Sequence, residues 1–324
     1  MGRSWFDRLQ PVFILLALGF VAYLLQSQWA TLRSYSWQLQ RGWLTLSACL
    51  MLASWSVEVY IWYTLVGLIG GLLSYGAALR LWWLSALIRY IPGNVWQPLS
   101  LTLYCQRYGV RAEITLASIV LYQAVVILAV MPIAACYFQI TGNWGLLTGL
   151  IGNMAPWLVA LTLVPVLFFL IRPGMLVSMM NWLLRKAGRA AVEANLTTGR
   201  LCWLLIIAAF NWLLWGACFG TLALALQDSD HGLPAYFVLH LVAVYPVAYV
   251  IGLLSLITPS GFGVREGAFY LLLAPVIGGG LVTVLALAMR VWNILGEVVM
   301  ALLSFLAERR WGAPTMPIPV EPAL

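Results

Sequence analysis

The chain contains several apolar segments long enough to cross a lipid bilayer, and this feature constrains its fold more than any other. A membrane-spanning α-helix needs about 20 consecutive, mainly apolar residues. Segments of this kind cover residues 43–66, 114–137, 201–226, 235–257 and about 281–306. Of the 324 residues, 63% are hydrophobic and 8% are charged, whereas soluble domains have roughly 45–50% and about 25%. The sequence therefore predicts an all-α polytopic membrane protein.

Two further apolar segments raise the expected number of transmembrane helices to about seven to eight. Residues 11–25 follow a basic start, as in a signal peptide, but no small-residue cleavage site comes after them, so we expect an uncleaved span. Residues 145–171 contain prolines that are expected to kink or split the helix. We expect a single transmembrane domain over residues 1–308 and a disordered, proline-rich tail over residues 309–324.

A polar, glycine-rich break separates two of the apolar segments, where residues 259–267 read PSGFGVREG. A charge near the bilayer centre costs about 2.5–3.5 kcal/mol, and non-helical backbone at that depth must be covered by protein or line a watery cavity. Arg265 and Glu266 therefore indicate a functional site. Gly261 and Gly263 allow a tight turn, and the N–H groups at the start of the following helix favour an anion. We predict a re-entrant hairpin that binds an anionic head group.

The segment after this break is expected to complete the site. Residues 264–274 are predicted to form a half-helix that is ended by Pro275 and by the glycine run at residues 278–280. In the last span, Arg290, Asn293 and Glu297 are spaced i, i+3 and i+7 and so project from one face. We expect Arg290 to supply a second positive contact and Glu297 to balance the arginines.

An alternative for these charges is an internal ion-pair network that only fixes helix packing, as with Arg265 and Glu297 or Arg290 and Glu266. The span over residues 43–66 contains a further charged residue, Glu58. Ser47, Ser54 and Glu58 fall on one face of the expected helix. That face is expected to point into the protein, where Glu58 would also balance the arginines.

A second break lies at residues 91–98, which read IPGNVWQP. Neither flanking segment is a comfortable span of about 20 uncharged residues, so we predict a second re-entrant helical hairpin. Its candidate site residues are Arg89, Asn94 and Gln97. The alternative is an amphipathic surface helix, because the aromatic residues Trp82, Trp83 and Tyr90 could form an interfacial belt. Two such breaks, each preceded by spans, are consistent with an internal repeat.

The basic residues are scattered between apolar spans, so the net charge of +7 indicates membrane topology and not nucleic-acid binding. Residues 172–200 form the one sizeable predicted loop, with five Lys or Arg against one Glu. By the positive-inside rule we place this loop in the cytoplasm and the protein in the plasma (bacterial inner) membrane. The cysteines show no CxxC spacing and the histidines no HExxH pattern, so we expect no metal and no cofactor.

The two breaks and the last span also resemble a known family. Residues 259–267 are similar to the PGGxGxREG signature of the flippase-like membrane domain of the lysylphosphatidylglycerol synthase family. Residues 89–96, RYIPGNVW, resemble its KYIPGxVW motif, and residues 288–297, AMRVWNILGE, resemble its arginine-containing last span. The resemblance implies a membrane domain that moves or exposes lipids across a membrane.

Some features depart from the family pattern. Ser260 replaces the usual first glycine, and no charge follows the N-terminal Pro-Gly until Arg107. Only a short tail follows the last span, so we do not expect the chain to aminoacylate a lipid.

These features together predict a lipid translocase and not an enzyme. The expected substrate is an anionic phospholipid or a polyprenyl-phosphate-linked lipid, with its head group bound at the re-entrant helix ends. No GxxxxGK[ST] loop is present, so transport would be downhill or coupled to an ion or to the membrane potential. The alternatives are a non-catalytic partner of a cell-envelope enzyme and a polyprenyl-phosphate-dependent glycosyltransferase, for which only Asp228 and Asp230 could supply the acidic group. The oligomeric state is left open.

Overall fold

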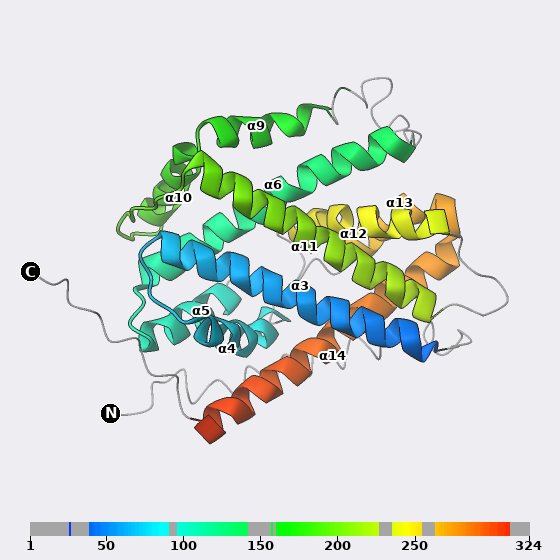
Figure 1. The fold of residues 1–324 in the computed structure, drawn as a ribbon, viewed down its shortest axis with the longest axis horizontal. Helices are drawn as coiled ribbons and strands as arrows, with labels where there is room; N and C mark the ends of the chain where they lie inside the picture. The colour runs from blue at the N-terminus through cyan, green and yellow to red at the C-terminus, as the bar shows by residue number, and fades with distance from the viewer. Residues whose placement is uncertain are drawn as a thin grey trace, which may run out of the picture.

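The computed structural model describes residues 39–90, 96–141, 160–226, 235–254 and 263–311, together with Gln26 and Trp157. Within these ranges every element is helical (Figure 1). The elements in chain order are α3 (Arg41–Leu68), α4 (Tyr75–Ala86), the short 3₁₀ helix η1 (Leu87–Tyr90), α5 (Trp96–Arg107), α6 (Ala112–Thr141), α9 (Leu163–Ile171), α10 (Gly174–Lys186), α11 (Thr198–Ala225), α12 (Ala235–Leu254), α13 (Val264–Ile277) and α14 (Gly279–Trp311). The predicted all-α fold is confirmed for the described residues.

Four helices, α3, α6, α11 and α14, are long and apolar enough to cross a membrane, and the bent pair α9 and α10 would make a fifth if it forms one span. α12 is apolar but shorter. The expected total of seven to eight includes the segment at residues 11–25, which lies outside the described residues, so that number stays a prediction. α14 runs to Trp311, beyond the expected domain boundary at residue 308.

The centre of the fold is α11, which lies beside α3 and packs against α12 (Figure 1). Gly216 and Gly220, one helical turn apart, form the contact with α12. A Cβ atom at Gly216 would collide with the backbone of Val242, and one at Gly220 would lie 3.2 Å from Val238 Cγ1. Small residues at this spacing let membrane helices approach closely and gain dispersion contacts. This GxxxG pattern thus sets the distance between α11 and α12.

The polar face predicted for the first described span points inward as expected. Ser47 and Ser54 on α3 are fully buried. The Ser47 hydroxyl donates to the Cys218 carbonyl oxygen at 2.9 Å, and the Tyr122 hydroxyl donates to Glu58 Oε1 at 2.6 Å. These bonds join α3 to α11 and α6.

The helices that flank the N-terminal break pack against each other and against their neighbours. Trp82 and Trp83 on α4 are buried, and Trp83 meets Trp55 of α3 edge to face with ring centroids 4.5 Å apart. An interfacial belt would expose these rings, so that interpretation is wrong for these two tryptophans. Residues 91–95, which include Asn94 and the expected turn, lie outside the described residues, and the re-entrant path stays a prediction.

Two boundaries differ from the sequence prediction. Residues 174–186 of the expected loop form α10, because Leu176, Met180 and Leu184 make a buried apolar stripe at helical spacing. α13 continues through Pro275 to Ile277. It ends at Gly278, the first glycine of the predicted run, whose φ of +84° is readily adopted only by glycine. Of the two predicted stops, the glycine and not the proline ends the helix.

Candidate functional site

The glycine-rich break leads directly into the start of α13. Gly263 has a φ of +80°, in the left-handed region that favours glycine, as predicted for a tight turn. Its N–H donates to Glu266 Oε2 at 2.8 Å, so the Glu266 carboxylate caps the helix from which it projects. Gly261 lies outside the described residues. The positive end of α13 therefore already holds an anion, supplied by the protein itself.

The second oxygen of the same carboxylate binds α14. Arg290 Nε lies 2.8 Å from Glu266 Oε1. Only about a tenth of the Arg290 side chain is exposed, against about a quarter of Glu266. The predicted ion pair between these two residues is confirmed. One carboxylate thus bridges the first turn of α13 to a buried arginine on the last span.

Arg265 makes a different set of contacts, and among the described residues none of them is with a carboxylate at salt-bridge distance. Its guanidinium lies over the rings of Tyr245, Tyr249 and Phe269, at 4.9, 4.8 and 5.6 Å from their centroids. It also donates to the Tyr245 hydroxyl at 2.7 Å. The alternative pair of Arg265 with Glu297 is therefore not the arrangement that forms. Three aromatic rings stabilise the cation through their quadrupoles.

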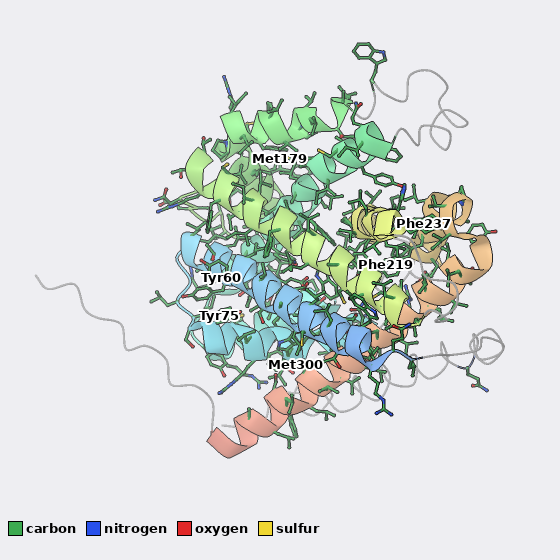
Figure 2. The ribbon with its side chains drawn as sticks, turned by 45° about the vertical axis from the view of Figure 1, so that its right-hand side comes forward. Tyr60, Tyr75, Met179, Phe219, Phe237 and Met300 are labelled. Carbon is green, nitrogen blue, oxygen red and sulfur yellow. The ribbon has the colours of Figure 1, made fainter. Side chains whose placement is uncertain are left out.

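The three rings around Arg265, those of Tyr245, Tyr249 and Phe269, form an aromatic cage that is closely packed. Tyr245 and Phe269 are almost fully buried, and Phe219 of α11 stacks on Phe269 with ring centroids 4.9 Å apart (Phe219 in Figure 2). On α12, Gly252 makes room for the arginine, because a Cβ atom there would lie 2.9 Å from Arg265 Cβ. Side chains from α11, α12 and α13 hold Arg265 in one place.

The polar face of α14 lies next to Arg265 and Glu266. Arg290 and Glu297 are buried, and the Asn293 side chain between them approaches the Tyr245 hydroxyl. The structure therefore brings Arg265, Glu266, Arg290 and Asn293 together where α12, α13 and α14 meet. We call these four residues, three charged side chains and one amide, the charged cluster.

The other predicted site residues belong to the N-terminal half. Glu58 is half-buried and bonded to Tyr122, and Gln97 is half-buried in the first turn of α5. The backbone of Arg89 lies in η1. α14 packs against both α4 and η1 as well as against α13. The helix that carries Arg290 therefore adjoins both predicted breaks.

Sequence reasoning missed the aromatic cage, although its pattern is visible in the sequence. Tyr245 and Tyr249 are one helical turn apart in an expected span, and Phe269 follows Arg265 by four residues. Two aromatic residues at that spacing share a helix face, and an arginine one loop away is a natural partner. No group of three or more His, Cys, Asp or Glu that could hold a metal occurs within the described ranges. Asp228 and Asp230 lie outside them.

The fold and the charged cluster define an all-helical membrane domain with a paired ionic group at a helix break. The chain belongs to the family described as the lysylphosphatidylglycerol synthase TM region, whose model matches residues 10–306. This match confirms the resemblance seen in the two breaks and the last span. A comparison with curated proteins gave no match.

Proposed function

We propose that the chain is a flippase-like lipid translocase for an anionic phospholipid or a polyprenyl-phosphate-linked lipid. Membership in a family of membrane domains named for a lipid-modifying synthase supports lipid handling. The observation that carries the proposal is the Glu266 carboxylate, which binds the Gly263 N–H and Arg290 at 2.8 Å each. A backbone N–H at a helix start and an arginine are also the donors that bind phosphate best.

The proposed step is an exchange of anions. A lipid phosphate takes the place of the Glu266 carboxylate, and the carboxylate turns away toward water, since about a quarter of its side chain is already exposed. The number of paired charges stays the same, so the exchange avoids leaving an uncompensated buried arginine, which would cost several kcal/mol. Arg265, held in its aromatic cage, keeps a positive charge one residue away throughout.

We place the end of the molecule that carries α10 in the cytoplasm. The segment after α10 is tied to the ends of three other helices there: Arg189 lies 3.6 Å from Glu113 of α6, the Asn195 N–H donates to Leu68 of α3, and Thr197 caps α11. Basic residues gather at this end, as the positive-inside rule expects for a cytoplasmic face in the plasma membrane. The residues concerned are Arg107, Arg172, Arg185, Lys186, Arg189 and Arg200.

The proposal is tested by transport in reconstituted vesicles. A fluorescent phosphatidylglycerol and a fluorescent phosphatidylcholine are incorporated separately, and the rate at which each becomes accessible to an external quencher is measured. Arg290→Gln should slow phosphatidylglycerol at least about ten-fold, because a phosphate loses a charge-assisted bond. Arg41→Gln is the matched control, since Arg41 is exposed at the start of α3.

Equal rates for wild type, Arg290→Gln and protein-free vesicles would contradict transport by this chain. That result would favour the alternative, a non-catalytic partner of a cell-envelope enzyme. A wild-type rate that exceeds the protein-free rate but is unchanged in Arg290→Gln would place the lipid path elsewhere.

A further inference from the structure

We propose that α10 is an interfacial helix that lies along the cytoplasmic leaflet and binds anionic lipid head groups. This inference does not depend on lipid translocation. It rests on the sectors of α10, on its angle to α9 and on the charges at its end.

The side chains of α10 fall into three sectors. Leu176, Met180 and Leu184, at i, i+4 and i+8, are buried against the rest of the protein. A second sector is apolar but exposed: Met179 is 52% and Trp182 is 54% exposed (Met179 in Figure 2). Met175 and Leu183 complete this sector, since i, i+4, i+7 and i+8 lie on one side of a helix.

The third sector is polar. It contains Ser178, Asn181 and Arg185, at i, i+3 and i+7. The Asn181 amide accepts from the Val192 N–H and donates to the Val192 carbonyl oxygen, both at 2.9 Å. These bonds attach the segment after α10 to this side of the helix. A helix with a buried stripe, an exposed apolar stripe and a polar stripe suits a surface where protein, acyl chains and water meet.

The orientation of α10 supports the same location. α10 is bent by 96° from α9, so it runs nearly perpendicular to that helix. The side chains of α9 are apolar and largely exposed; Leu167 is 58% exposed, for example. Such a surface suits contact with acyl chains, and with α9 along the bilayer normal, α10 lies in the plane of the membrane.

The basic residues of α10 favour an anionic leaflet over an apolar protein partner. Arg185 and Lys186 occupy its last turn, and Lys186 Nζ lies 5.7 Å from the centre of the Trp182 ring. A lysine beside an interfacial tryptophan can keep its stem against the acyl region and its ammonium among the head groups. Near-surface Lys and Arg are attracted to anionic lipid. The basic residues and the exposed apolar sector of α10 thus both favour a membrane surface that contains anionic lipid.

The first arm of the test measures depth with spin labels on adjacent residues. The exposed cysteines Cys49, Cys136 and Cys202 are replaced by serine, and the buried Cys105 and Cys218 are kept. Single labels are then placed by Met179→Cys or Ser178→Cys in full-length protein in nanodiscs. Successive helix residues are about 100° apart, so the label at 179 should collide mainly with oxygen in the lipid phase. The label at 178 should collide mainly with a water-soluble nickel chelate.

Three outcomes would overturn the interfacial location. Both labels at bilayer depth would make α10 half of a broken span. Both labels in water would remove the membrane contact. A label at 179 that is immobile and shielded from both reagents would mean that another protein surface covers this sector.

The second arm tests the preference for anionic lipid with a local probe. A bimane fluorophore at Met179→Cys is quenched by acyl-chain nitroxides carried on either phosphatidylglycerol or phosphatidylcholine, at equal mole fraction. Phosphatidylglycerol should quench more strongly, and Lys186→Gln should reduce the ratio of the two by up to about five-fold, the expected effect of one near-surface charge. Arg41→Gln should leave the ratio unchanged, because Arg41 begins α3, whereas the segment after α10 bonds to Leu68 at the other end of that helix. Equal quenching by the two lipids in the parent protein would overturn the anionic preference.

Discussion

α12 contacts α11 and α13 in opposite ways. Toward α11 it meets Gly216 and Gly220, and the two backbones approach so closely that a Cβ atom at Gly216 would collide with Val242. Toward α13 it meets Arg265, a cation held by Tyr245 and Tyr249. At these two glycines the contact is apolar and involves no charged side chain. The second brings a charged group into the helix bundle.

The comparison distinguishes a contact that stabilises the fold from a contact that brings a buried charge into it. Close packing of small residues is an inexpensive way to join membrane helices, because apolar side chains gain no hydrophobic free energy by leaving lipid. A buried charge opposes insertion and must be compensated by partners. A contact that only joined α12 to α13 would be simpler without Arg265, and we therefore propose that Arg265 has a role beyond packing.

The largest expected change in stability comes from the apolar contact. Gly216→Ala should lower the free energy of unfolding by about 2 kcal/mol, since an overpacking cost of about 3 kcal/mol is offset by a gain of about 1 kcal/mol in helix propensity. Gly220→Ala should be nearly neutral, because its Cβ would meet only the Val238 side chain, at 3.2 Å. Thermal unfolding in detergent, followed by intrinsic fluorescence, measures both. Equal losses for the two variants would show that this crossing does not set the helix separation.

A smaller effect is expected at the charged contact. Tyr245→Phe keeps a ring over the Arg265 guanidinium and removes the hydroxyl that accepts its bond at 2.7 Å. A hydrogen bond to a charged group contributes about 1.5–3 kcal/mol, and the remaining rings should limit the loss to the lower end. The same unfolding measurement applies. Tyr270→Phe is the control on an exposed tyrosine of α13, and a loss no greater than in this control would mean that the rings alone hold the arginine.

The sequence predicted the parts of the structure that depend on local pattern. The inward face of α3 followed from the spacing of Ser47 and Ser54. The start of α13 followed from the glycines before it. The pairing of Arg290 with Glu266 was one of two pairs that were named, because buried charges of opposite sign must find partners. These features are set by helical period and charge.

The parts that were missed depend on contacts between distant segments. The rings of α12 around Arg265 were missed, because they precede it by 16 and 20 residues in the chain and their orientation depends on how α12 packs on α11. α10 was missed because its apolar stripe lies within a segment rich in basic residues. The predicted half-helix stopped at residue 274, before Pro275 and the glycine run, but a proline near a helix end removes only one bond, and α13 continues to the first of those glycines, Gly278.

The most direct test of the central claim is to exchange the charges of the pair. Glu266→Arg and Arg290→Glu are made singly and together, and both thermal stability and phosphatidylglycerol transport are measured in reconstituted vesicles. Each single variant should lose stability and transport. The double variant should regain part of the stability, because the two side chains can pair again, but not transport, because a carboxylate would then stand where Arg290 is proposed to bind phosphate. Transport at the wild-type rate in the double variant would contradict this account and make the pair a packing element alone.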